Sequence, residues 1–144
     1  MSRIVLALLA SAAVSMPTLS ACGSSFGPGT GGCRVTADNP HRSKNMPSDV
    51  VGKGKIVCDV PAADVFLYVQ VEREDGNQWV SVADGDQPLI GVVEVGRSAV
   101  RQAAHPCEPG RFRTAARGEG TLGGQRSASV AWTYSQVVTD PCGT

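Results

Sequence analysis

Side chains that could serve as a catalytic base are few in this 144-residue chain. It has two histidines, His41 and His105, and no Gly-x-Ser-x-Gly segment of the kind that presents a serine nucleophile. A serine or cysteine hydrolase needs a nucleophile, a base within hydrogen-bond reach of it, and a third group that orients the base. His105 stands beside Pro106-Cys107, which is typical of a turn next to a disulfide. The sequence therefore favours a protein without nucleophilic catalysis.

The acidic residues support an alternative hypothesis, an enzyme that acts through exposed carboxylates. The two close pairs are Glu72 with Glu74 and Asp84 with Asp86. On a strand or in a turn such pairs are usually solvated charge, and the second pair lacks the further acidic ligands of a calcium loop. Residues 118–124 are rich in glycine but have no following Lys-Ser/Thr, so a phosphate site is not indicated. No cofactor is expected.

Arginines form the first candidate binding surface. Arg111, Arg113 and Arg117 all lie at odd positions of a strand-like run, so they share one face. Three more arginines are near in sequence: Arg97, Arg101 and Arg126. The guanidinium group is a planar fork that fits phosphate and carboxylate, so the stripe could contact anionic envelope polymers or lipid headgroups. The simpler interpretation is a solvated sheet face.

Two aromatic residues near the carboxyl end form the second candidate. Trp132 and Tyr134 alternate with Ala131, Thr133 and Ser135, so both rings share a face. We expect these rings to pack in the core, because aromatic side chains bury large apolar areas. If they faced outward together, they would form a patch suited to a partner.

The amino-terminal segment has the features of an export signal. Arg3 precedes an apolar run over residues 4–14 that is too short to span a bilayer permanently. The run is followed by Leu19-Ser20-Ala21-Cys22, which resembles the lipobox of bacterial lipoproteins. In that family the cysteine is lipidated and becomes the first residue of the mature protein. The resemblance implies that residues 1–21 are a signal peptide and that Cys22 is anchored at the outer face of the cell membrane.

Two other interpretations of this segment remain. A conventional signal peptidase would cut after Ala21, but Leu19 then occupies a position where small residues are preferred. A buried strand or helix over residues 4–14 fits poorly with the initiating Met and Arg3. With the lipobox interpretation, the glycine- and serine-rich residues 22–32 are a flexible tether and residues 33–144 are one folded domain.

The number of cysteines is consistent with an exported domain. If Cys22 carries lipid, four cysteines remain, and four cysteines allow three pairings. Cys107 and Cys142 lie just outside two strand-like runs that face each other across residues 118–124, so a hairpin would bring them together. The remaining pair is then Cys33–Cys58, and we prefer this pairing over the other two. A zinc site is not expected, because the sequence has no Cys-x2-Cys pair.

Alternation of apolar and polar residues indicates strands throughout the domain. The clearest run covers residues 64–73 and is followed by Asp75-Gly76, a typical hairpin turn. Residues 38–53 show no periodicity and are predicted to be a loop, and residues 97–104 a helical turn or an irregular connection. Seven to eight short strands with two disulfides predict an antiparallel, immunoglobulin-like β-sandwich, with a small β-barrel as the alternative.

Composition narrows the functional hypotheses. The 13 basic and 13 acidic residues balance, so the chain lacks the strong positive charge that is typical of nucleic-acid-binding proteins. The segment Cys107-Glu-Pro-Gly-Arg-Phe-Arg113 resembles a pattern in small secreted β-proteins of actinomycetes that have no assigned activity. We therefore expect a non-catalytic, membrane-anchored lipoprotein that binds an envelope component or a protein. An envelope enzyme and a phage-encoded lipoprotein that blocks competing phage are the alternatives.

Overall fold

The computed structural model describes residues 23–27, 32–85, 89–129 and 131–143. The regular elements of these residues are all β-strands: β1 (Ser24–Phe26), β2 (Cys33–Ala37), β3 (His41–Arg42), β4 (Asp49–Cys58), β5 (Ala62–Asp75), β6 (Gln78–Asp84), β7 (Gly91–Val93), β8 (Ser98–Pro106), β9 (Arg111–Leu122), β10 (Gln125–Ala128), β11 (Thr133–Tyr134) and β12 (Val138–Thr139). Within this described part of the chain, no helix could cross a membrane.

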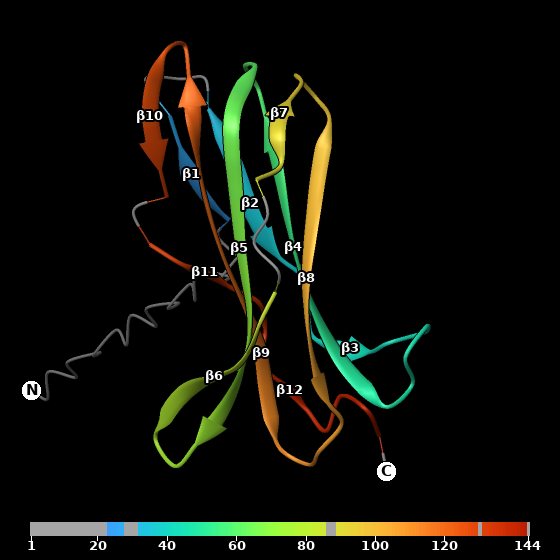
Figure 1. The fold of residues 1–144 in the computed structure, drawn as a ribbon. Helices are drawn as coiled ribbons and strands as arrows, with labels where there is room; N and C mark the ends of the chain where they lie inside the picture. Colours follow the sequence, from blue (N-terminus) through green and yellow to red (C-terminus); the bar gives the residue numbers. More distant parts are fainter. Residues whose placement is uncertain (1–22, 28–31, 86–88, 130, 144) are drawn as a thin grey trace, which may run out of the picture.

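The strands form two antiparallel sheets that pack face to face (Figure 1). In the first sheet the order is β1-β2-β4-β3, and β8 pairs with the other edge of β4. In the second sheet the order is β10-β9-β5-β6, with β11 and β12 also on β9 and β7 on β5. The described strands close no barrel, so the predicted antiparallel sandwich is confirmed.

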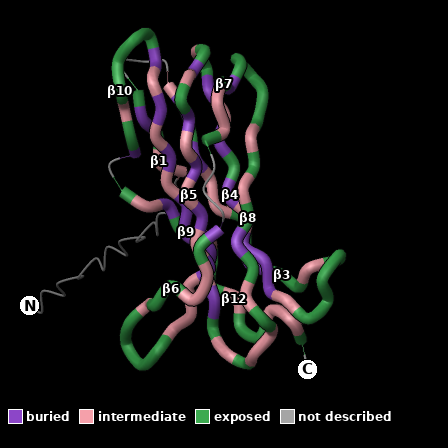
Figure 2. Tube along the Cα trace, in the orientation of Figure 1, coloured by how far each residue is buried: buried purple, intermediate pink, exposed green. Residues whose placement is uncertain are grey.

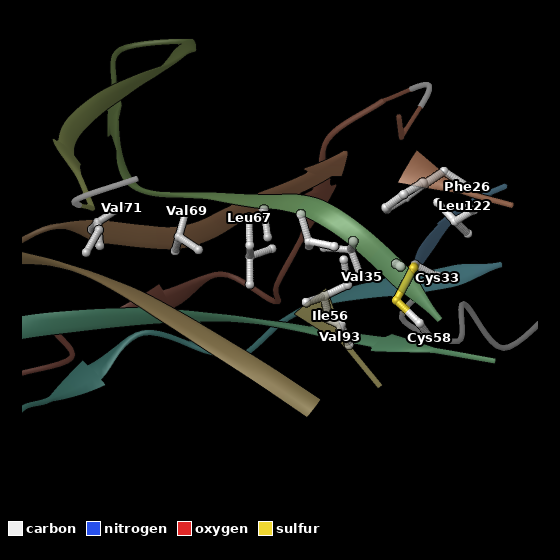
Figure 3. Close-up of a cluster of buried hydrophobic side chains, with 14 of the residues drawn as sticks. Phe26, Cys33, Val35, Ile56, Cys58, Leu67, Val69, Val71, Val93 and Leu122 are labelled. Atoms are coloured by element: carbon white, nitrogen blue, oxygen red, sulfur yellow. A yellow bond between two sulfur atoms is a disulfide. The ribbon is translucent and has the colours of Figure 1, made fainter. Parts of the chain in front are cut away.

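The core lies between the sheets and is built mainly from valine. The strand predicted over residues 64–73 is the centre of β5, where Val65, Leu67, Val69 and Val71 face inward and are at most 1% exposed. Figure 3 shows Leu67, Val69 and Val71 in a row, with Phe26 at the far end of the same cluster, and the buried residues of Figure 2 follow the same strands. The hairpin prediction is also confirmed, because Gly76 begins the turn between β5 and β6 with φ of 61°.

Both predicted disulfides are present. Cys33 and Cys58 stand directly opposite each other in the β2–β4 pair, and Cys107–Cys142 joins the end of β8 to the carboxyl-terminal segment. Each closes a loop of a few tens of residues, so each contributes on the order of 3 kcal/mol in the chain-entropy model.

The prediction of a turn over residues 118–124 is wrong. Strand β9 continues to Leu122, and the turn is confined to Gly123 and Gly124, both of which have positive φ. Gly118 is a strand residue because the opposite sheet presses on it: an added Cβ would lie 2.8 Å from both Phe26 and Val35. Glycine is required there by close packing and not by a turn.

Two other segments also contain more strand than the sequence predicts. Residues 97–104 are not helical or irregular, because they form most of β8, which pairs along nearly the whole of β4. The predicted loop over residues 38–53 contains β3 and the start of β4. Alanine, glutamine and glycine give these segments little strand propensity, so pairing with neighbouring strands determines their conformation.

A short strand lies within the segment predicted to be a tether. The lipobox and Cys22 fall outside the described residues, but Ser24–Phe26, within the predicted tether 22–32, form β1 on the edge of β2. Phe26 is 6% exposed and belongs to the core. Residues Ser24–Phe26 of the predicted tether therefore pack with the domain.

Replacing Gly118 with alanine tests the close packing of the sheets. The new methyl group would collide with Phe26 and Val35, so we expect G118A to lower the free energy of unfolding by about 1–3 kcal/mol. Gln125→Ala, at an exposed position of β10, is the control and should change it by less than about 0.5 kcal/mol. Equal midpoints in urea denaturation for the two variants would contradict this account.

Candidate functional site

The outer face of the second sheet carries most of the aromatic residues of the protein. We call it the aromatic–arginine face; its members are Phe66, Tyr68, Trp79, Arg113, Arg117, Arg126, Trp132 and Tyr134. Both tryptophans, both tyrosines and one of the three phenylalanines lie on it. The other two phenylalanines, Phe26 and Phe112, are in the core. A chain with few aromatic residues thus places most of them on an outer surface.

Two arginines of β9 are each held between two rings. The Arg113 guanidinium carbon lies 3.8 Å from the ring centre of Tyr134 and 4.5 Å from that of Trp79. For Arg117 the corresponding distances are 5.1 Å to Tyr68 and 5.5 Å to Trp132. A cation over an aromatic face is attracted by the ring quadrupole, by about 0.5–2 kcal/mol depending on desolvation. The two arginines therefore join strands β6, β5 and β11 across β9.

Carboxylates neutralise much of the charge of the arginine stripe. Arg113 Nε donates to Glu72 Oε2 at 2.6 Å, with side chains only 20% and 12% exposed. The more exposed Arg111 pairs with Glu74, also at 2.6 Å. Glu72 and Glu74 are the residues of the carboxylate-enzyme hypothesis, and both are occupied by ion pairs in this arrangement. Most of the positive charge on this face is therefore neutralised by carboxylates and is not free in solvent.

Arg117 differs from its neighbours. No ion pair of Arg117 is found in the described part of the chain, and its Nε is buried without a hydrogen-bond partner. Beside Arg117, the Tyr68 hydroxyl donates to Glu119, which also pairs with Arg126. Burial, followed by this hydrogen bond, raises the pKa of Tyr68 above its ordinary value. Tyr68 therefore stays protonated and neutral at physiological pH.

The expectation that Trp132 and Tyr134 pack in the core is wrong. Thr133 takes the inward position, at 5% exposure opposite Ala116, and the two rings point outward onto Arg117 and Arg113. The two candidate surfaces of the sequence, arginines and aromatics, are therefore one surface.

Three members of this face were not predicted from the sequence: Phe66, Tyr68 and Trp79. The alternation over residues 64–73 already places Phe66 and Tyr68 opposite the valines, which is the signal that could have identified them. Of the nearby arginines, Arg126 joins the face over Phe66 at 5.6 Å. Arg97 lies in the turn after β7 and Arg101 on β8 of the other sheet, so neither belongs to it.

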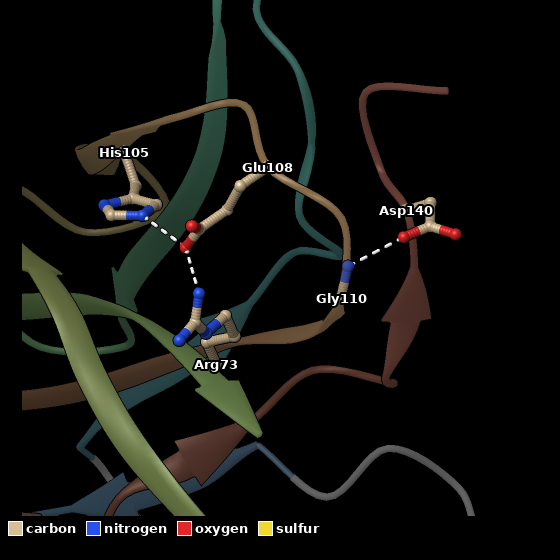
Figure 4. Close-up of polar contacts among 5 residues, drawn as sticks. All are labelled: Arg73, His105, Glu108, Gly110 and Asp140. Atoms are coloured by element: carbon tan, nitrogen blue, oxygen red, sulfur yellow. Dashed lines mark hydrogen bonds and ion pairs between the residues drawn. The ribbon is translucent and has the colours of Figure 1, made fainter. Parts of the chain in front are cut away.

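A second polar cluster lies at one end of the sandwich (Figure 4). Glu108 accepts from His105 Nε2 at 2.8 Å and pairs with Arg73 at 2.6 Å. The hydrogen bond from His105, aided by Arg73, lowers the pKa of Glu108. Nearby, the Gly110 amide donates to Asp140 at 2.7 Å. These bonds fix the β8–β9 turn beside the Cys107–Cys142 disulfide, where a pocket of about 310 Å³ opens.

Nothing in this cluster brings together a catalytic or metal-binding set. His105 is engaged by Glu108 rather than by a serine or cysteine nucleophile. Across the described residues, no group of three potential metal ligands is found.

No family model matches the chain, and a search of curated proteins finds no significant relative. The class of protein is therefore defined by the fold and the surface: a disulfide-linked β-sandwich with an outward aromatic–arginine face.

Removing Arg113 tests the energetics of this face. Arg113→Ala leaves Glu72 largely buried without its partner and removes two ring contacts, so we expect a loss of about 1–3 kcal/mol of unfolding free energy. Arg111→Ala removes an exposed pair on the same strand and should cost less than about 1 kcal/mol. Thermal or urea unfolding that ranks R111A as the more destabilising variant would contradict this assignment.

The lowered pKa of Glu108 predicts a dependence of stability on pH. The ionised form is favoured in the folded state, so its contribution is present above the ordinary glutamate pKa of about 4.3 and is lost as pH falls through the lowered value. Since both side chains of the Arg73 pair are about one-third exposed, the contribution should be under about 1 kcal/mol. Unfolding of Glu108→Gln should approach that of the wild type below about pH 4. Glu94→Gln, at an exposed position, is the control.

Proposed function

We propose that this protein is a bacterial surface lipoprotein, anchored through Cys22 at the outer face of the cell membrane, whose β-sandwich binds an envelope component or a protein through the aromatic–arginine face. The role is non-catalytic. The observation that carries the proposal is the outward placement of both tryptophans and both tyrosines around two arginines. Tryptophan, tyrosine and arginine are the residues most enriched where binding energy concentrates in protein interfaces.

The order of these side chains supports a binding role. Arg113 and Arg117 are held by rings on both sides, and Arg113 also by Glu72, so their rotamer freedom is already restricted before a partner arrives. Preorganised side chains lose less entropy on binding. Tyr134 remains 43% exposed, which leaves apolar ring surface for contact.

The charge of the face favours one kind of partner. Two of the three arginines of the face, Arg113 and Arg126, are paired with a glutamate, as is the neighbouring Arg111. A partner would therefore meet ring edges and paired charges, which suits a protein or a mixed polar polymer better than a simple polyanion.

Cysteine pairing supports the lipid anchor. The four cysteines of residues 33–144 form two disulfides with each other, so Cys22 is the one cysteine that they leave over. An exported protein with a single unmodified thiol would be exposed to unwanted disulfide exchange. Lipidation of Cys22 removes that thiol.

Photo-crosslinking in a producing bacterium tests the proposal. A crosslinking amino acid at Ser81, on the exposed part of β6 opposite Glu72, should capture a partner in the membrane fraction. The matched control is Lys55, exposed on β4 of the other sheet, which should capture none. Mass spectrometry of the same protein should find Cys22 as the acylated first residue. A free Cys22 thiol would reject the anchor, and equal capture at both positions would reject the face.

A further inference from the structure

The point at which a lipid anchor would enter the domain is fixed by strand β1. Ser24 is the first residue of β1, and it follows Cys22 by two residues. Two residues of chain span at most about 7 Å. A lipid on Cys22 would therefore hold the edge of the sandwich close to the headgroups, with no long tether between them.

This edge is the one that carries Trp132. Strand β1 lies at the edge of the first sheet, on the side of the molecule opposite β8 (Figure 1). The Ser24 hydroxyl donates to Ser129 at 3.3 Å, and Ser129 is three residues before Trp132. Because β1 is antiparallel to β2, with Ser24 opposite Val35, Gly23 lies beside Thr36, toward the Ala37 end of β2.

Strand β11 lies at the same height along the sandwich as the Ala37 end of β2. An added Cβ at Gly54, the partner of Ala37, would lie 3.1 Å from Ala116, and Ala116 pairs with Thr133 of β11. Strands β2 and β11 are in contact. Trp132 and Tyr134, which flank Thr133, are therefore the outward aromatic residues nearest to the anchor.

We propose that the lipidated domain stands on this edge, with Trp132 and Tyr134 in the headgroup layer of the membrane. The inference rests on the lipid anchor of the proposed function. Tryptophan and tyrosine favour the membrane interface, because an apolar ring body and a polar tip suit its two sides. Arg34, exposed on strand β2 of the same side, suits a lipid phosphate.

In this orientation the sheet stands upright on the membrane. Strand β6 lies three strand spacings from β11 across the second sheet, but the rings of Trp79 and Tyr134 converge on the Arg113 guanidinium, 4.5 Å and 3.8 Å from its carbon. Trp79, from the strand farthest from the anchored edge, is then less deeply placed than Trp132, and the β6 side of the aromatic–arginine face stays open to a partner. The two tryptophans of the chain, Trp79 and Trp132, are thus natural reporters of the near and far parts of the face.

Depth-dependent fluorescence quenching tests the orientation. Cys22 of the chain 22–144, the cysteine left outside the two disulfides, is coupled to a maleimide phospholipid in vesicles of phosphatidylcholine and phosphatidylglycerol that contain brominated lipids. Trp79→Phe leaves Trp132 as the reporter, and Trp132→Phe leaves Trp79. We expect Trp132 to lose more of its fluorescence than Trp79, with a larger shift to shorter wavelength.

The outcomes separate this inference from the proposed function. Equal quenching of both tryptophans means that the sheet lies flat, and absence of quenching at Trp132 means that the edge is free for another partner; either result overturns the orientation. Uncoupled protein should show no quenching. Because the lipid is attached chemically, these results do not depend on acylation in cells, so an unacylated cellular protein would reject the anchor alone.

Discussion

The close approach of the two sheets at the glycines of β4 and β9 is the constraint on which the rest of the structure depends. At Gly52, Gly54 and Gly118 an added Cβ would meet side chains of the opposite sheet at 2.6–2.8 Å. Around Gly52 and Gly54 the space between the sheets is filled by valine, alanine, threonine and leucine side chains and has little room for a ring, whereas at Gly118 it is filled by Phe26. Trp132 and Tyr134, next to Thr133 at the same level, are left to the outside. Tight packing inside and aromatic rings outside are consequences of the same geometry.

Outward rings on a β-sheet need a second set of side chains to hold them, and the arginines of β9 fill this role. Arg113 joins β9 to β6 and β11 through Trp79 and Tyr134, and Arg117 joins β9 to β5 and to Trp132, just before β11. Glu72 compensates the charge of Arg113 where both are largely desolvated. The same contacts stabilise the second sheet and fix the surface in one conformation. Stability and preorganisation for binding are therefore coupled at this face.

Local patterns in the sequence predict the parts of the fold that are determined locally. Alternation over residues 64–73 and the Asp75-Gly76 turn predict the β5–β6 hairpin, and cysteine spacing predicts both disulfides. Gly118 and the alanine-rich β8 are strand residues only because of partners distant in sequence. In the candidate site, too, some positions follow from the local sequence and others depend on residues distant in the chain.

Alternation predicts which residues share a face but not which face is outward. For Arg113 the charge decides the question, so its position follows from the sequence. For Trp132 hydrophobicity points inward, and the decision depends on how closely β4 approaches β9, which no local pattern records. Phe26 shows the opposite error, because it was expected outside the core and lies within it. Its glycine- and serine-rich neighbourhood indicates a tether, but one large ring is enough to bind the segment to the core.

The Cys33–Cys58 disulfide has a particular consequence for a domain held at its amino terminus. Force on Cys22 would reach β1 first, and this strand has three residues and one buried side chain, Phe26. Peeling of β1 from β2 would be opposed by few backbone hydrogen bonds. It would stop at Cys33, because the disulfide joins the beginning of β2 covalently to the end of β4 in the first sheet. Figure 3 shows this bond beside Phe26 at the end of the core. The covalent link therefore lies where a pull on an anchor would otherwise open the sandwich.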